Sequence, residues 1–108
     1  MPDIASLSTR VAGRMAHPPQ LVVSGPLDVT TTDELQRVLH RELAARGQLL
    51  LDLSAVTSMN SCGIRVIVWA IKLARRNGWS FGIRDEMPEH VREVFQTAGL
   101  EPFLPLTA

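Results

Sequence analysis

The stretch that decides the fold is Gln48 to Gly78, QLLLDLSAVTSMNSCGIRVIVWAIKLARRNG. Its apolar run Leu49–Leu53, interrupted by Asp52, is typical of a short buried strand. After a loop of about seven residues, the pattern predicts a helix from about Ser61 to Asn77, with Gly78 as its stop. A serine hydroxyl is therefore expected in the first turn of a helix. Unpaired N–H groups and the positive end of the helix dipole favour a phosphate there.

Composition limits the class of protein before any motif is considered. With 108 residues, 45% apolar and 20% charged, the chain is expected to form one domain over residues 1–108, with a core of about 5–106. Eleven basic and eleven acidic residues cancel, which gives no sign of a nucleic-acid partner. No apolar stretch approaches the roughly 20 residues of a membrane span, and no signal-peptide core is visible, so no membrane insertion is expected. The single cysteine, Cys62, favours a reducing, cytoplasmic location.

Strands and helices alternate along the rest of the chain. The expected strands are Leu7–Val11, Gln20–Ser24 (ended by Gly25 and Pro26, and expected to run antiparallel to the first), Leu49–Leu53 and Trp79–Arg84, with a short edge strand as an option in 100–106. Thr31 and Glu34 have the spacing of a capping box that opens a helix, which Gly47 ends. Its expected apolar face is Leu35, Val38, Leu39 and Leu43.

A last helix is expected to start at Pro88 and to end at Gly99, with Val91, Val94, Phe95 and Ala98 facing one way. The alternation predicts an α/β fold. We expect a mixed, largely parallel sheet of four to five strands packed by three or more helices.

Three segments carry a resemblance to a known family. They are Val22–Asp28 with Thr30–Leu35 after it, Leu51–Ile64, and Pro88–Leu100 ending in Ala98, Gly99 and Leu100. In this order and spacing they resemble the STAS domain, specifically the small bacterial anti-sigma factor antagonists. The resemblance covers roughly residues 5–106.

The resemblance implies a phosphorylation switch, with no cofactor and no enzymatic activity of the chain itself. In the family, the unphosphorylated antagonist binds an anti-sigma factor that is also a serine kinase, and the sigma factor is released. The kinase then phosphorylates the antagonist, which dissociates, and a serine phosphatase resets the cycle. The residue that matches the phosphorylated serine is Ser61, and Asp28 matches an acidic residue that lies near it and contacts the partner. The expected partner-binding residues are Asp28, Asn60, Ser61, Cys62 and Gly63, to which the polar stripe of the long helix adds Arg65 and Trp69.

Two residues depart from the family motif Asp-Ser-Ser-Gly-Leu. Asn60 stands in place of the acidic residue, and Cys62 in place of the second serine. Asparagine is a good N-cap, so the helix start is expected to survive the change. The lost carboxylate removes a negative charge beside the acceptor, and Cys62 removes a rival hydroxyl.

Helical spacing also predicts a polar stripe on the long helix. Ser61, Arg65, Trp69, Lys72 and Arg76 share one side, and Gly63, Ile67, Ala70 and Ala74 share the opposite side, which is expected to pack on the sheet. Two interpretations of Trp69 remain open. It either lies flat against a neighbouring element, covered by the stems of Arg65 and Lys72, or anchors a partner, as Trp and Arg often do. Arg65, four residues after Ser61, is also placed to pair with a phosphate there.

Other interpretations of the candidate residues also remain open. Ser61 is alternatively a simple helix-start serine, and Asp28 an ordinary turn residue. Asp52 is interpreted as structural, bonded to backbone in the following loop. No metal cluster or catalytic constellation is visible, because Cys62 has no companion histidine at a meaningful spacing. The sequence lacks the acidic pair and the lysine that a receiver domain would need. A second interpretation remains: a STAS scaffold, or a subunit of a lipid-transport ABC complex, that is not phosphorylated.

Overall fold

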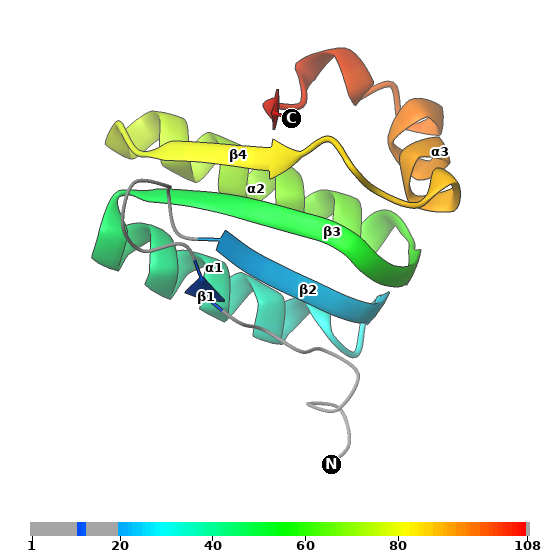
Figure 1. Cartoon of the computed structure of the whole chain (residues 1–108), viewed down its shortest axis with the longest axis horizontal. Helices are drawn as coiled ribbons and strands as arrows, with labels where there is room; N and C mark the ends of the chain where they lie inside the picture. The colour runs from blue at the N-terminus through cyan, green and yellow to red at the C-terminus, as the bar shows by residue number, and fades with distance from the viewer. Residues whose placement is uncertain (1–10, 13–19, 108) are drawn as a thin grey trace.

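The computed structural model describes residues 11–12 and 20–107. Within that part the chain forms an α/β sandwich of one sheet and one helical layer (Figure 1). The elements are β1 (Val11–Ala12), β2 (Gln20–Leu27), α1 (Thr32–Arg46), β3 (Gln48–Met59), α2 (Ser61–Asn77), β4 (Ser80–Arg84), α3 (Glu89–Thr97), the 3-10 turn η2 (Glu101–Phe103) and β5 (Leu106–Thr107). Most of the predicted strand Leu7–Val11 lies outside the described residues.

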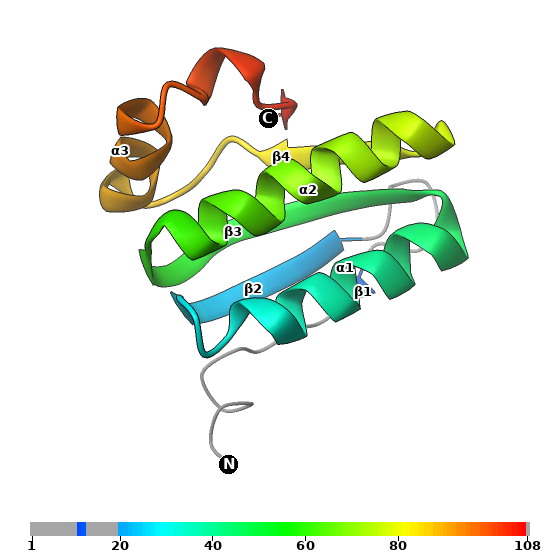
Figure 2. The same ribbon diagram turned by 180° about the vertical axis from the view of Figure 1, so that it is seen from behind.

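The sheet has the strand order β1-β2-β3-β4-β5 over the described residues. Strand β1 is antiparallel to β2, and the pairs β2–β3, β3–β4 and β4–β5 are parallel. Helices α1 and α2 lie side by side across one face of the sheet (Figure 2). Helix α3 lies beyond the carboxyl ends of the strands (Figure 1). The predicted α/β class, with a mixed, largely parallel sheet packed by three helices, is confirmed.

The core lies between the sheet and the helices α1 and α2, and it also includes Val91 and Phe95 of α3. Alternate strand residues such as Leu21, Leu51 and Ile83 are fully buried, as period-two patterning requires. The predicted apolar face of α1 is buried throughout: Leu35, Val38, Leu39 and Leu43. The predicted inner face of α2 is buried as well: Gly63, Ile67, Ala70 and Ala74.

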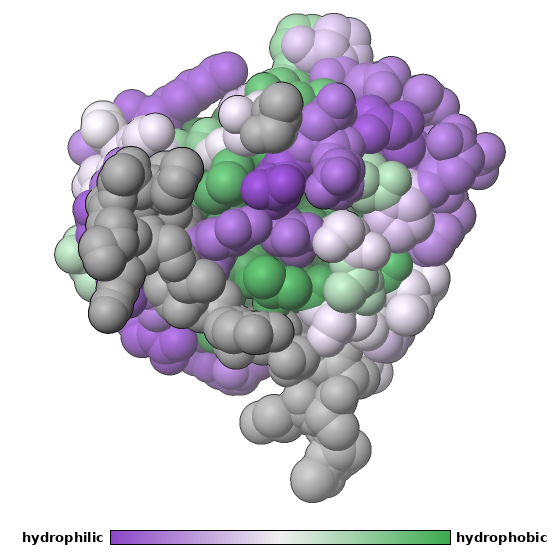
Figure 3. Space-filling view, in the orientation of Figure 1, coloured by the Kyte–Doolittle hydropathy of each residue, from purple (hydrophilic) through white to green (hydrophobic). Residues whose placement is uncertain are grey.

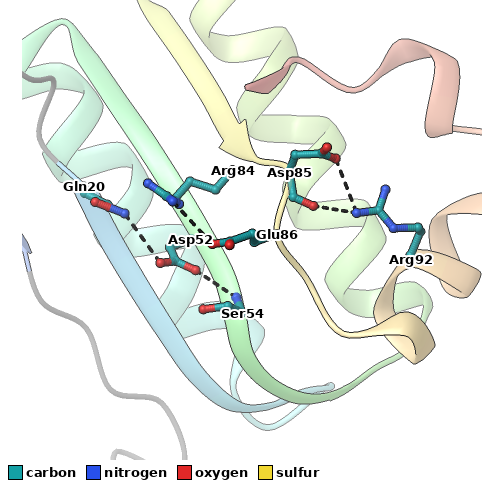
Figure 4. A network of polar contacts seen from close by, with 7 residues as sticks. All are labelled: Gln20, Asp52, Ser54, Arg84, Asp85, Glu86 and Arg92. Atoms are coloured by element: carbon teal, nitrogen blue, oxygen red, sulfur yellow. Dashed lines mark hydrogen bonds and ion pairs between the residues drawn. The ribbon is translucent and has the colours of Figure 1, made fainter. Parts of the chain in front are cut away.

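The other face of the sheet is mixed. Figure 3 views this side and shows hydrophilic residues beside apolar patches. Asp52 accepts a hydrogen bond from the backbone N–H of Ser54 at 2.9 Å and one from Gln20 Nε2 at 3.5 Å (Figure 4). Its predicted structural role is confirmed, although Ser54 belongs to the same strand and not to a following loop.

Three local predictions were wrong. The loop of about seven residues before Ser61 does not exist, because β3 continues to Met59 and pairs with β2 up to that residue, with two shifts of register. Strand β2 likewise continues through Gly25 and Pro26 to Leu27, with irregular pairing at that point. Among the described residues, β1 pairs only with Gln20 and Leu21 of β2, so Pro26 lies outside that ladder.

The third wrong prediction is the capping box of α1. Thr31 is the N-cap residue, but its side chain makes no capping hydrogen bond. The hydroxyl instead donates to the carbonyl of Pro26 at 2.8 Å and accepts from the backbone N–H of Asp28 at 3.1 Å. The threonine therefore closes the turn between β2 and α1, where it is almost fully buried.

The packing predicts a large effect of truncation at the centre of β3. Leu51→Ala should lower the free energy of unfolding by about 2–5 kcal/mol, because Leu51 is 0% exposed and the neighbouring side chains cannot fill the cavity. Urea unfolding followed by circular dichroism measures the change. Thr57→Ala, at an exposed position of the same strand, is the control and should stay within about 0.5 kcal/mol of the parent chain. Similar values for the two variants would contradict this description of the core.

Candidate functional site

The candidate site forms where strands β2 and β3 end. Leu27 and Met59 are the last paired residues of the two strands, and the backbone N–H of Asn60 donates to the carbonyl of Leu27 at 3.2 Å. Asp28 and Ser61 each follow one of these bonded residues, so the topology brings the two chain segments together. Carboxyl ends of parallel strands are the usual position of binding sites in α/β sheets.

Asn60 caps helix α2. Its Oδ1 accepts a hydrogen bond from the backbone N–H of Cys62 at 2.9 Å, as the sequence predicted. Ser61 is the first residue of the helix, its side chain is exposed, and its hydroxyl has no hydrogen bond to any described residue. Ser61 is therefore a first-turn serine and does not cap the helix, since the residue before it makes the cap.

Gly63 allows α2 to approach the strand ends. A Cβ atom at this position would lie 2.6 Å from Met59 Cγ and 3.2 Å from Leu27 Cβ. Both distances are shorter than ordinary contacts between carbon atoms. Because Met59 and Leu27 are the last residues of β3 and β2, Gly63 brings the first turn of the helix against both of them. Its role in this structure is packing, which is separate from its predicted part in partner binding.

Asp28 is held in a hydrogen-bonded turn. Its Oδ1 accepts from the hydroxyl of Thr30 at 2.6 Å and from the backbone N–H of Thr30 at 2.9 Å. These bonds, led by the hydroxyl, favour the carboxylate and lower the pKa of Asp28 from its ordinary value. A fixed negative charge therefore stands next to the end of β2 at neutral pH.

Two shallow grooves meet at Ser61. The first, of about 550 Å³, runs along the outer side of α2. Arg65 and Trp69 line it, together with other residues of the predicted polar stripe. The second, of about 450 Å³, separates the start of α2 from α3, and His90 and Glu93 line it opposite Ser61. Sequence reasoning missed these two α3 residues. No local signal could have found them, because only the packing of α3 brings them to this position.

Trp69 lies between the two helices of the helical layer. Its ring is half-buried, and the ring centroid lies 6.3 Å from that of His40 on α1, with the planes tilted by 33°. The residue therefore contacts a neighbouring element, as one interpretation predicted. One edge still lines the groove that contains Ser61 and Arg65, which leaves surface for a partner.

Two features are absent from the described residues. Nowhere in 20–107 do three or more His, Cys, Asp or Glu side chains gather in a way that could hold a metal ion. Within the same residues, each helix is too short or too polar to span a bilayer.

This geometry agrees with the family found by comparison. A model of the STAS domain matches residues 10–108, and the chain belongs to that family. The fold also resembles that of an anti-sigma factor antagonist from Mycobacterium paratuberculosis, with a TM-score of 0.81 and 25% sequence identity over 98% of this chain and 87% of that one.

Two structures of a second antagonist share the fold at lower identity. The anti-sigma factor antagonist SpoIIAA in its unphosphorylated form aligns with a TM-score of 0.73 and 14% identity, over 94% of this chain and 89% of that chain. The Bacillus cell fate determinant SpoIIAA in its phosphorylated form aligns with a TM-score of 0.63 and 16% identity, over 94% of this chain and 92% of that chain. These two likenesses establish the fold.

The close approach at Gly63 leads to a prediction about stability. Gly63→Ala should destabilise the chain by about 1–3 kcal/mol, although alanine normally favours a helix, because the added methyl group collides with Met59 and Leu27. Chemical unfolding measures the difference. Ser61→Ala, two residues earlier and exposed, is the control and should change stability by no more than about 0.5 kcal/mol. Stabilisation by Gly63→Ala would show that the helix does not depend on this contact.

Proposed function

We propose that this protein is an anti-sigma factor antagonist of the bacterial cytoplasm. In this proposal the unphosphorylated chain binds an anti-sigma factor with serine kinase activity, and a sigma factor is released. The kinase transfers the γ-phosphoryl group of ATP to Ser61 Oγ, which ends the binding, and a serine phosphatase removes the phosphate. Membership of the STAS family and the likeness to an antagonist at 25% identity support this role.

One observation carries the proposal. The hydroxyl of Ser61 is exposed at the first position of a 17-residue helix, has no hydrogen bond to the described residues, and stands where two grooves meet. A kinase needs an acceptor that is accessible and not already bonded. A partner needs a surface around that acceptor, and the grooves supply one.

The helix start also determines where the effect of a phosphate should fall. A phosphoserine carries about −1.5 to −2 charges at pH 7. The first turn of α2 contains no acidic residue, and the N-terminal end of a helix favours negative charge. The fold should therefore tolerate the modification, while a partner seated on the same surface is repelled.

The charges around Ser61 differ from those of a site with an acidic residue before the serine, and Asn60 and Arg65 determine them. Asn60 keeps the cap without adding a negative charge, and Arg65 lies one helical turn after Ser61 in the same groove. Both features favour a bound phosphate electrostatically. They also change the charge pattern that a kinase would recognise.

A second function has specific residues in its favour. Asn60 and Cys62 replace the acidic residue and second serine of the family motif, as expected if phosphorylation had been lost. The protein would then be a constitutive STAS subunit of a signalling complex or of a lipid-transport ABC complex.

Affinity capture from lysate of the native host, with Ser61→Ala and Ser61→Asp as baits, distinguishes these functions. We expect an ATP-binding anti-sigma factor on the Ser61→Ala bait and at least about a tenfold loss of it on the Ser61→Asp bait. Mass spectrometry identifies the proteins, and thermal unfolding checks that both baits fold equally well. Recovery of the same transporter or scaffold subunits on both baits would contradict the switch and support the constitutive function.

Trp69 provides an independent test of the surface. Trp69→Ala should weaken binding of the captured anti-sigma factor by about 2 kcal/mol or more, because the ring lines the groove next to Ser61. Isothermal titration calorimetry measures the affinity. Trp69→Phe keeps an aromatic ring against His40 and is the conservative control, with a smaller loss expected. Full affinity in the alanine variant would remove Trp69 from the partner-binding surface.

A further inference from the structure

The cationic side chains of α2 differ from those of the other elements. Helix α2 carries Arg65, Lys72, Arg75 and Arg76 and no acidic residue. All four are exposed, and none of them lies within 4.0 Å of a carboxylate of the residues that the structure describes. In the same part of the chain, every arginine outside α2 is in an ion pair: Arg37, Arg41, Arg46, Arg84 and Arg92.

These four cations form a compact positive surface. At 3.6 residues per turn they fall within an arc of roughly 100° on the side of the helix that faces away from the sheet. The chain as a whole has a formal net charge of zero, so this surface is a local concentration of charge. A surface of one sign without internal partners favours a ligand of the opposite sign.

An apolar cavity adjoins the positive surface. It has a volume of about 190 Å³ and lies between α2 and the C-terminal segment, where its apolar walls are Val68, Ile71, Leu100, Phe103 and Leu104. Lys72 and Arg75 also line it. Phe103 is 68% exposed, which is unusual for an aromatic side chain, and leaves apolar surface in contact with solvent.

The size and chemistry of the cavity select the kind of occupant. Pockets for small molecules usually measure about 300–1,000 Å³, so a cavity of 190 Å³ is too small for most cofactors. It is large enough for one bulky apolar side chain. Nucleic acid fits less well, since its phosphates could meet the cations but it has no aliphatic side chain for the apolar walls of the cavity.

We infer that the outer face of α2 docks an acidic amphipathic helix of a partner protein. One large apolar side chain of that helix enters the cavity beside Phe103, and its carboxylates pair with Arg75, Arg76 and Lys72. This is recognition of a helix by its apolar anchors, with charge setting the orientation.

The inference rests on the proposed function and adds the chemistry of the partner to it. Ser61 lies at one end of the same helix face, in the groove that also includes Arg65, Lys72 and Arg76. A phosphate there reduces the formal charge of this face from +4 to about +2 at pH 7 and attracts Arg65. An acidic partner then meets a new negative charge at the Ser61 end of this face, and the charge of the face that attracts it is smaller.

The test uses a synthetic 18-residue peptide as probe, with glutamates on its polar face and one phenylalanine on a leucine-rich apolar face. A second peptide has glutamine at every glutamate position. Each is titrated into the full-length, ¹⁵N-labelled chain and followed by NMR. We expect the acidic peptide to shift amides of the outer face of α2 and of residues 100–104, and to bind at least about tenfold more tightly than the glutamine peptide.

Variants of the chain locate the interaction. Arg75→Glu/Arg76→Glu should lower the affinity for the acidic peptide by at least about tenfold. Arg41→Glu/Arg84→Glu makes the same change in net charge at arginines of α1 and β4 and should leave the affinity within about twofold. Equal loss in the two double variants, equal binding of the two peptides, or tighter binding of a single-stranded DNA 12-mer would overturn the inference.

Ser61→Asp separates the failure of this inference from that of the proposed function. If the acidic peptide fails to bind but the anti-sigma factor is still lost from the Ser61→Asp bait, the docking inference falls and the proposed function stands. The opposite outcome is that Arg75→Glu/Arg76→Glu abolishes binding of the acidic peptide, while Ser61→Asp changes neither the affinity for the peptide nor the capture of the anti-sigma factor. In that case the docking surface stands and the phosphorylation switch falls.

Discussion

Helix α2 can lie against the ends of β2 and β3 because residue 63 has no side chain. A Cβ at Gly63 would stand 2.6 Å from Met59 and 3.2 Å from Leu27, so a larger residue would push the start of the helix away. The approach occurs where the Asn60 N–H bonds to the Leu27 carbonyl and where Asn60 caps the helix through Cys62. The close contact at Gly63 thus lies next to the strand ends, the helix start and the exposed Ser61.

Helix α2 has a different role on each of its two sides. The inner side, which includes Ile67 and Ala70, is buried against the sheet and contributes to the core. The outer side carries Ser61 and four exposed cations. Packing of the inner side against the core determines the position of the outer side, because a helix is rigid over its length. A charge added at Ser61 therefore changes the electrostatics of a surface whose position is already fixed. Stability and recognition can then change independently, which is what a reversible switch requires.

Local chemistry explains how much the sequence could predict. The helix Ser61–Asn77, its asparagine cap and its buried face follow from periodicity and side-chain chemistry within a few residues. The second half of β3 was missed because Ser54, Ala55, Thr57 and Ser58 are exposed and break the alternation. Pairing with β2, about 30 residues earlier, holds that half as a strand. His90 and Glu93 were missed for a similar reason, since tertiary packing alone brings α3 to Ser61.

The measurement that tests the account most directly compares the chain carrying phosphoserine at position 61 with the unmodified chain, by ¹⁵N NMR and thermal unfolding. The account predicts amide shifts confined to the first two turns of α2 and the facing residues of α3, with a Tm within about 4 °C of the unmodified value. Shifts that spread through β2 and β3, or a larger fall in Tm, would contradict it. They would show that the fold itself, and not a partner surface, responds to charge at Ser61.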